Sequence, residues 1–349
     1  MWIRLKRTLL LAAMLGVGVT AVDATQAAEK KTTKSVAHKH KAKSTVAHSK
    51  SAALSRHGKP AHLAKKKSAS MVASASSSAW KETQDLAVRS GSALVVDQAA
   101  GDAIFHKNAS AVMPIASITK LMTAMVVLDS APNLQAHLTI AEDDVDTLRG
   151  SRSRLHVGSV MSREVALLLA LMSSENRAAH ALARNYPGGM PAFIAEMNLK
   201  AQALGMRDTH FEDPTGLTSS NVSTANDLVK MVVAAYRYPL IREFTTTSEA
   251  TVDVAGRELA YRNTNPLVKS AAWDVGLSKT GYIHEAGKCL VMQARVADKP
   301  VVIVLLDSAG KQTRVGDANR IKRWMESTHA ARKVPTHAAL LAENVRPPS

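Results

Sequence analysis

Residues 275–307 read VGLSKTGYIHEAGKCLVMQARVADKPVVIVLLD, and this stretch decides the fold class. Its apolar runs are the length of strands, and turn residues such as Gly287 and Pro300 separate them. Connections this short join neighbouring antiparallel strands, so the stretch predicts a three-stranded meander. The expected strands cover residues 275–283, 288–297 and 301–307.

The rest of the chain supplies two more strands and a block of helices. Residues 92–97 and 103–106 are typical of a hairpin, and Pro114 is expected to open the first helix. The expected helices cover residues 114–128, 163–185 with an interruption at Ser173-Ser174, 190–205, 224–237 and 319–328. Two strands, helices, three strands and a helix predict an α+β domain, with one antiparallel sheet drawn from both ends of the chain.

The charge of the chain is unevenly distributed. The 349 residues are 46% apolar and carry a net charge of +16. Residues 29–80 hold twelve Lys or Arg and one acid, whereas residues 81–349 hold thirty Lys or Arg and twenty-seven acids. The basic character therefore belongs to a segment near the N-terminus and not to the folded body. We expect no nucleic-acid partner.

The composition predicts four segments. Residues 1–27 are typical of a signal peptide, with Arg4, Lys6 and Arg7 before a short apolar run; an uncleaved anchor is the alternative. Residues 28–84 are rich in Lys, His, Ala and Ser, which predicts a disordered tether whose charge favours nonspecific contact with anionic wall or membrane. The folded domain is expected over 85–328 and a flexible tail over 329–349.

The sequence SITK at residues 117–120 is the first candidate for chemistry. Residues three apart share one face of a helix, so Lys120 is expected to reach the Ser117 hydroxyl. A partly desolvated lysine is able to serve as the base that a serine nucleophile needs. Other S-x-x-K matches begin at Ser78 and Ser308, but only Ser117 stands at the start of a strongly apolar helix.

Two further short motifs follow in the chain. SEN at residues 174–176 interrupts a helical block, as a loop that feeds a cleft would. SSN at residues 219–221 is a competing match, which we rank second because it does not lie between two apolar helical runs. KTG at residues 279–281 is the only K-[ST]-G in the chain and lies in the first strand of the meander. A glycine there permits close approach of a substrate backbone.

The order S-x-x-K, S-x-N, K-T-G is typical of penicillin-binding proteins and of class A β-lactamases. The chain resembles the low-molecular-mass penicillin-binding proteins, which are D-Ala-D-Ala peptidases with a β-lactamase/transpeptidase-like fold. Within them it is most similar to the D-alanyl-D-alanine endopeptidase subgroup, since residues 329–349 hold no long amphipathic anchor. The resemblance covers residues 85–328 and rests on four segments, Pro114–Ala124, Asp213–Leu217, Arg262–Leu267 and Gly276–Tyr282.

The resemblance implies a role for each motif residue. Ser117 would be the acyl-ester nucleophile, Lys120 the base of acylation and Ser174 a proton relay to the leaving group. The substrate-binding residues would be Asn176, Lys279, Thr280 and Gly281, with Lys279 and Thr280 holding the substrate carboxylate. The backbone N–H groups of Ser117 and of a residue near Tyr282 would form the oxyanion hole.

The resemblance also implies partners and location. The substrates would be peptidoglycan peptides in the periplasm, β-lactams would be covalent inhibitors, and no metal or organic cofactor is expected. The single cysteine, Cys289, lies in an apolar run and is expected to be a buried hydrophobe.

Three alternatives to the endopeptidase stay open at this point. A D-Ala-D-Ala carboxypeptidase needs the same motifs. A serine β-lactamase must also deacylate fast, and no E-x-x-x-N element lies between Ser174 and Lys279. A noncatalytic wall-binding protein would rely on the basic tether and would not need the three motifs.

Overall fold

The computed structural model describes residues 86–310 and 312–333. The predicted signal peptide (1–27) and tether (28–84) lie outside these residues, as does the predicted tail from residue 334 onward. These segments therefore stay predictions. None of the helices in the described part of the chain combines the length and the apolar character that a membrane crossing needs.

The strands and helices alternate in blocks along the chain. The strands are β1 (Ser92–Asp97), β2 (Ala103–Lys107), β3 (Met113–Pro114), β4 (His137–Thr139), β5 (Val160–Ser162), β6 (Val222–Ser223), β7 (Glu249–Val254), β8 (Arg257–Arg262), β9 (Asp274–Ile283), β10 (Gly287–Val296) and β11 (Lys299–Ser308). The α-helices are α2 (Lys120–Asp129), α3 (Arg163–Met172), α4 (Asn176–Arg184), α5 (Gly189–Ala203), α6 (Ala225–Ala235), α7 (Pro239–Thr246) and α8 (Thr313–Lys333). The 3₁₀ helices are η1 (Ala116–Thr119), η2 (Glu142–Asp144) and η3 (Pro266–Lys269).

One antiparallel sheet joins the two ends of the described domain. Its strand order is β2-β1-β11-β10-β9, so the first strand of the domain pairs with the last. In that pair Ser92 lies opposite Leu306 and Asp97 opposite Val301. The α+β fold predicted from the sequence is thereby confirmed. Strand β9 is an edge strand of this sheet, with one side free of any sheet partner among the described strands.

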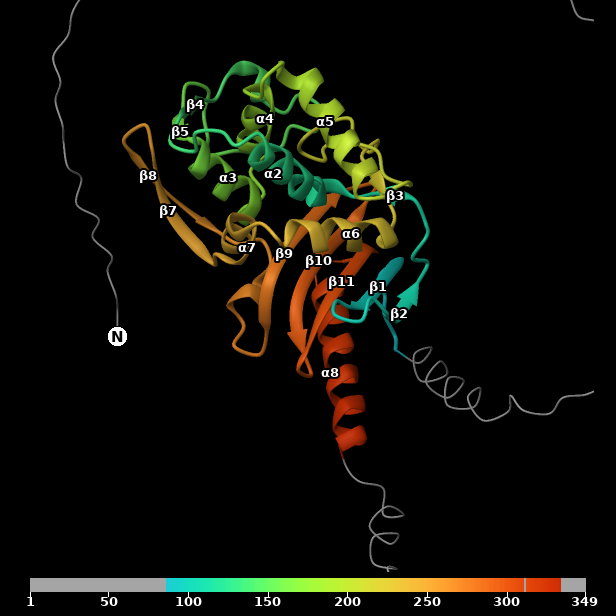
Figure 1. The fold of residues 1–349 in the computed structure, drawn as a ribbon. Helices are drawn as coiled ribbons and strands as arrows, with labels where there is room; N and C mark the ends of the chain where they lie inside the picture. Colours follow the sequence, from blue (N-terminus) through green and yellow to red (C-terminus); the bar gives the residue numbers. More distant parts are fainter. Residues whose placement is uncertain (1–85, 311, 334–349) are drawn as a thin grey trace, which may run out of the picture. The chain divides into compact units, whose positions relative to one another are not determined.

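Helices cover both faces of the sheet (Figure 1). Successive residues of a strand point to opposite faces. Leu94 and Val96 accordingly pack in the core beneath the helical block, where α6 contributes Leu228. Val95 packs with Ile321 of α8 on the other face. Because both faces are buried, β1 and β11 each contain a continuous apolar run, residues 93–96 and 301–306, in which apolar and polar residues do not alternate.

The elements outside the main sheet differ from the expectation in three main ways. Pro114 ends the short strand β3, which pairs with β6, and does not open a helix; the α-helix begins only at Lys120. Helix α7 and the β7–β8 hairpin, over residues 239–262, were not predicted. Helix α8 extends beyond the expected 319–328 at both ends.

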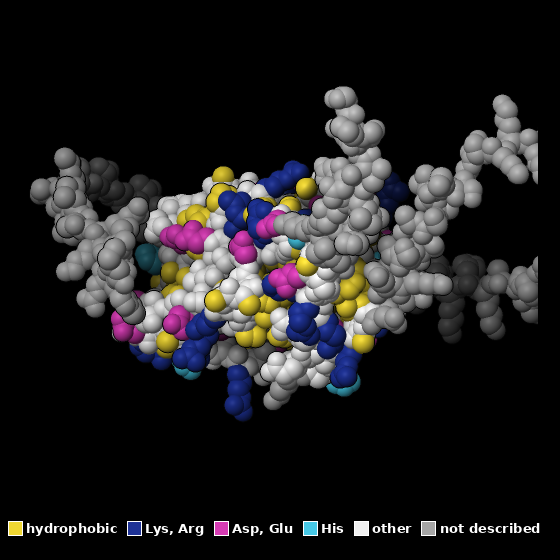
Figure 2. Space-filling view, turned by 90° about the horizontal axis from the view of Figure 1, so that it is seen from below, with side chains coloured by type: hydrophobic (Ala, Val, Ile, Leu, Met, Phe, Trp, Pro, Cys, Tyr) yellow, Lys and Arg dark blue, Asp and Glu magenta, His cyan; other side chains and the backbone are white. Residues whose placement is uncertain are grey.

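The surface of the described domain carries charges of both signs. Figure 2 shows Lys and Arg side chains interspersed with Asp and Glu side chains on one face. This mixture agrees with the nearly balanced charge of residues 81–349. The positive charge on that face is therefore not gathered into a stripe of the kind that binds a polyanion.

Candidate active site

The segment before α2 holds Ser117 on a 3₁₀ turn. Residues i and i+3 eclipse one another in a 3₁₀ helix, so the Ser117 and Lys120 side chains project in the same direction. The Nζ atom of Lys120 lies 2.9 Å from the Oγ atom of Ser117. Ala116, the residue before the serine, has φ +48°, which is uncommon for a residue other than glycine. Ser117 therefore follows a residue with a strained backbone conformation and lies just before the N-terminus of α2.

The Lys120 side chain has two further partners. Its Nζ donates to Oδ1 of Asn176 at 2.7 Å and to the carbonyl oxygen of Thr215 at 2.7 Å. Both of these oxygens only accept hydrogen bonds. A neutral amine has two hydrogens for them and one lone pair left, and that lone pair then faces the Ser117 hydroxyl. The contacts therefore suit a lysine that accepts the serine proton.

The charge state of Lys120 is set by its burial. The side chain is 1% exposed. Burial lowers the pKa of the Lys120 ammonium to about 7, although the carboxylates of Asp213, Glu175 and Asp146 oppose this change. A substantial fraction of Lys120 is therefore unprotonated near neutral pH.

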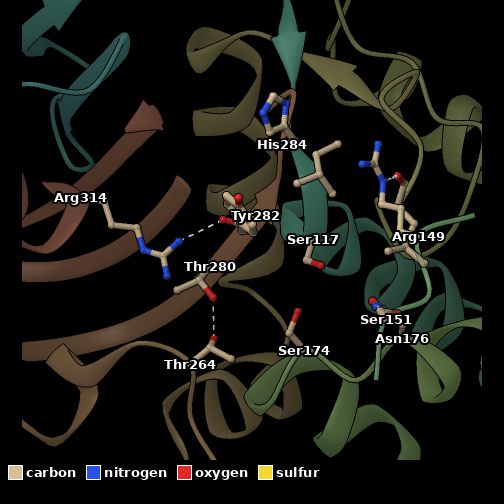
Figure 3. A pocket seen from close by; sticks show the side chains of 13 residues that line it. Ser117, Arg149, Ser151, Ser174, Asn176, Thr264, Thr280, Tyr282, His284 and Arg314 are labelled. Carbon is tan, nitrogen blue, oxygen red and sulfur yellow. Dashed lines mark hydrogen bonds between the residues drawn. The ribbon is translucent and has the colours of Figure 1, made fainter. Parts of the chain in front are cut away.

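The loop between α3 and α4 brings the S-x-N motif to the same place. Ser174 adopts φ +62°, and its Oγ accepts a hydrogen bond from Nζ of Lys279 at 2.9 Å. Asn176 begins α4, and its Nδ2 donates to Oγ of Ser151 at 2.9 Å while its Oδ1 faces Lys120. Ser174 and Asn176 line the cleft (Figure 3) and are hydrogen-bonded to Lys279 and Lys120, respectively.

The competing S-x-N match lies elsewhere. Asn221 is fully buried, and its Nδ2 donates to the Thr119 hydroxyl and to the carbonyl oxygen of Asp213. It therefore supports the segment behind the nucleophile and does not line the cleft. The decoy Ser308 is buried beside Ser90, 2.6 Å between the two Oγ atoms, and the decoy Ser78 lies outside the described residues.

Strand β9 carries the K-T-G motif along one wall. Lys279 is 1% exposed, and burial lowers its pKa well below the ordinary value, helped by the positive charges of Lys120 and Arg314. Its Nζ donates to Ser174 Oγ and to the carbonyl oxygen of Thr280. The Thr280 hydroxyl donates to Oγ1 of Thr264 at 2.6 Å.

Two glycines allow neighbouring backbone segments to approach the nucleophile segment closely. A Cβ atom on Gly281 would lie 2.9 Å from the carbonyl oxygen of Ile115 and 3.1 Å from the nitrogen of Ser117. A Cβ atom on Gly216, which has φ +79°, would lie 1.9 Å from the carbonyl oxygen of Ala116. Gly216 and Gly281 therefore both pack closely against the backbone of the η1 segment, where a side chain would not fit.

These side chains meet in one cleft of about 470 Å³ (Figure 3). Of the predicted residues, Lys120 and Lys279 lie beneath its floor and the others line it. The lining residues are Ser117, Arg149, Ser151, Ser174, Asn176, Leu217, Thr264, Thr280, Gly281, Tyr282, Ile283, His284 and Arg314.

Five polar lining residues were not predicted: Arg149, Ser151, Thr264, His284 and Arg314. Thr264 was within reach of sequence reasoning, because it lies in a segment that already resembled the family. Arg314 has no such signal; its Nη1 donates to the carbonyl oxygens of Gly281 and Cys289, contacts that exist only once α8 has packed beside the sheet. A guanidinium keeps its charge at neutral pH, so Arg314 is a permanent cation at the Thr280 end of the cleft.

Neither metal ligands nor a reactive thiol are apparent among residues 86–310 and 312–333. The His, Cys, Asp and Glu side chains of this part form no group of three that could hold a metal ion. Cys289 is buried, as expected, and burial raises the pKa of its thiol to about 11. The chemistry that the described cleft offers is that of a serine hydroxyl beside a neutral amine.

Comparisons with known proteins agree with this chemistry. A sequence model of the family described as D-alanyl-D-alanine carboxypeptidase matches residues 78–310. A D-alanyl-D-alanine endopeptidase of Pseudomonas aeruginosa is 52% identical over 246 residues, which is 70% of this chain and 79% of that protein. A mutant of a Streptomyces DD-transpeptidase has a TM-score of 0.65 at 29% identity, over 69% of this chain and 98% of that one. An ampicillin-bound penicillin-binding protein from Listeria monocytogenes has a TM-score of 0.60 at 28% identity, over 69% of this chain and 99% of that one.

Proposed function

The chain belongs to the D-alanyl-D-alanine carboxypeptidase family, and from this membership we propose that it is a serine D-alanyl-D-alanine endopeptidase that cleaves peptidoglycan cross-links. The observation that carries the proposal is the 2.9 Å contact between Lys120 Nζ and Ser117 Oγ, with the two hydrogens of the neutral amine donated to Asn176 Oδ1 and the Thr215 carbonyl oxygen. The endopeptidase name of the Pseudomonas relative supports the choice of bond.

The first chemical step forms an acyl-enzyme. Neutral Lys120 takes the proton of the Ser117 hydroxyl while Oγ attacks the carbonyl carbon of the D-alanine before the scissile bond. The oxyanion that develops would accept hydrogen bonds from the backbone N–H groups of Ser117 and Tyr282, which the close approach of Gly281 supports. The tetrahedral intermediate then collapses and expels the amine of the next residue.

Ser174 would return the proton. Its hydroxyl lines the cleft and accepts a hydrogen bond from Lys279, so that its own proton is available to the leaving amine. Lys120, protonated in the first step, would then give its proton to the Ser174 oxygen, because Ser117 is now an ester, and Lys120 would be neutral again. Water later attacks the ester with Lys120 again as base, and Ser117 is regenerated.

The substrate carboxylate next to the leaving amine would bind at the Thr280 end. The Thr280 hydroxyl would turn from Thr264 to donate to the carboxylate, and Arg314 is a permanent cation there. Lys279 is buried and would act through Ser174. An edge strand accepts an extended peptide by backbone pairing, and β9 is such an edge. The substrate would therefore lie along β9 with its carboxylate beside Thr280.

The place of action that we propose is the periplasm, where the predicted signal peptide would deliver the chain. β-Lactams would act as covalent inhibitors, since they present a carboxylate and a strained carbonyl to the same groups. The ampicillin-bound structural neighbour supports this expectation.

The test is a digest of purified, cross-linked peptidoglycan followed by separation of the fragments. The wild-type chain should convert cross-linked dimers to monomers, and the matched Ser117→Ala chain should leave them intact. Release of terminal D-alanine without loss of dimers would instead identify a carboxypeptidase. An unchanged digest with the wild-type chain, or an active Ser117→Ala chain, would overturn the proposal.

A further inference from the structure

A salt bridge spans the cleft beyond the nucleophile. Nη2 of Arg149 lies 2.9 Å from Oε2 of Glu285. Arg149 belongs to the loop after η2, on the helical side, and Glu285 to the turn between β9 and β10, on the sheet side. Arg149 and Arg314 lie on opposite sides of Ser117 (Figure 3). The cleft therefore has one guanidinium toward each end.

Arg149 is held in place independently of Glu285. The carboxylate of Asp146 accepts hydrogen bonds from the backbone N–H groups of Leu148, Arg149 and Ser151, which folds the loop around it. Burial raises the pKa of Asp146, but these hydrogen bonds outweigh it and leave the pKa below its ordinary value. Nε of Arg149 also donates to the carbonyl oxygen of Leu217. The guanidinium is thus positioned before any ligand arrives.

The bridge itself is accessible to solvent. The Arg149 side chain is 25% exposed and the Glu285 side chain 45% exposed. Exposed ion pairs contribute little to stability, because water solvates both partners and the side chains lose freedom. Another carboxylate is therefore able to take the place of Glu285 at little cost.

The direction of the substrate along β9 decides what reaches Arg149. The carboxylate next to the leaving amine would lie beside Thr280 and Arg314. A substrate peptide that pairs antiparallel with β9 then passes Tyr282 and reaches His284 in the direction of its own N-terminus. The acyl-donor part, which stays attached to Ser117 after the first step, therefore extends toward Arg149 and away from Arg314.

We propose that Arg149 binds a carboxylate of the acyl-donor peptide, carried N-terminal to the scissile D-alanine, and that Glu285 occupies the guanidinium until the substrate carboxylate replaces it. The inference rests on the proposed function and adds a substrate class to it, namely acidic donor stems. A guanidinium matches a carboxylate with two parallel hydrogen bonds, which favours Arg over Lys for this task. Arg149 is then a specificity-determining residue and takes no part in the proton transfers.

The test compares two synthetic cross-linked peptides, in each of which the D-alanine of a donor stem is bonded to the side-chain amine of a diamino acid in an acceptor stem. They differ only in the side chain of the donor residue before that D-alanine, which ends in a carboxylate in one and in a carboxamide in the other. For the wild-type chain kcat/KM should be higher for the carboxylate peptide. In Arg149→Gln this preference should fall by about tenfold, the loss expected for one charge-assisted contact. The preference should rise in Glu285→Gln, because the competing carboxylate is gone.

The matched control is Arg152→Gln, in the same loop but outside the cleft lining, which should keep the wild-type preference. An equal loss on both peptides in Arg149→Gln would show a merely structural role and overturn the inference, as would an unchanged preference. Failure of the proposed function would look different, since the wild-type chain would then hydrolyse neither peptide.

Discussion

At the scale of single residues, the decisive feature is the environment of one amine. Lys120 is buried, and its Nζ atom contacts three oxygen atoms. Of these, only the Ser117 hydroxyl oxygen carries a hydrogen that it is able to donate. Lys279 lies nearby and is equally buried, but its partners are the Ser174 hydroxyl and a carbonyl oxygen. The two lysines therefore suit different tasks, Lys120 as base and Lys279 as the support of the relay serine.

The base assignment predicts a pH profile. Because Lys120 has a pKa of about 7 and acts when unprotonated, the acylation rate of the wild-type chain should rise with pH below about 7 and level off above it. Lys120→Arg keeps the charge, but a guanidinium does not give up its proton, so acylation should fall by roughly a thousandfold or more at every pH. The measurement is the second-order rate of labelling by fluorescent penicillin between roughly pH 5.5 and 9.

Lys230→Arg is the control for that series, because Lys230 pairs with Asp227 on α6, outside the cleft lining. It should retain the wild-type rate and profile. Near wild-type labelling of Lys120→Arg would remove Lys120 from the role of base and leave the relay serine as the better candidate.

At the scale of elements, the site depends on how closely β9 approaches η1. Gly281 faces the carbonyl oxygen of Ile115 and the nitrogen of Ser117, and both are backbone atoms that do not rotate out of the way. The same contact sets the distance between the two backbone N–H groups that would form the oxyanion hole. A glycine is needed here for close packing, since its φ is not in the left-handed region.

Gly281→Ala should therefore displace β9 from η1 and lower the acylation rate by about a hundredfold, the effect of a shift near 1 Å at a reacting centre. The chain should stay folded by circular dichroism. Gly316→Ala on α8 is the matched change, because its Cβ would meet nothing closer than 3.6 Å. A Gly281→Ala chain that acylates as fast as Gly316→Ala would show that the close approach is not required.

The elements also show what the sequence was able to predict. The strands of the meander lie within one or two residues of their expected ends, because period, turn residues and length agree there. Short strands such as β3 and β6 have no measurable period, and they exist because residues far apart pair. That pairing is why Pro114 ends a strand although its sequence context is typical of a helix start.

The motif residues of the cleft were predictable for the opposite reason. S-x-x-K, S-x-N and K-T-G are local patterns, and the structure brings all three together. Arg149 and Arg314 carry no local pattern, and they reach the cleft only through a loop folded on Asp146 and through the packing of α8. Sequence reasoning therefore found the residues next to the chemistry and missed the cations at the two ends.

At the scale of the whole molecule, the cleft lies where the edge of the sheet meets the helical block. The nucleophile comes from the helical side and the K-T-G strand from the sheet side, so neither part makes the site alone. The sheet in turn needs both ends of the domain, since β1 pairs with β11. The basic segment over residues 28–84 lies outside the described residues, and its contact with anionic wall or membrane stays a prediction.

The most direct test of the account is to find the atom that becomes acylated. The full chain would be reacted with benzylpenicillin, digested and mapped by mass spectrometry. We predict a single adduct on the peptide that contains Ser117, stable long enough to isolate, and no adduct in the Ser117→Ala chain. An adduct on another serine such as Ser174, or stable labelling of the Ser117→Ala chain, would contradict the account.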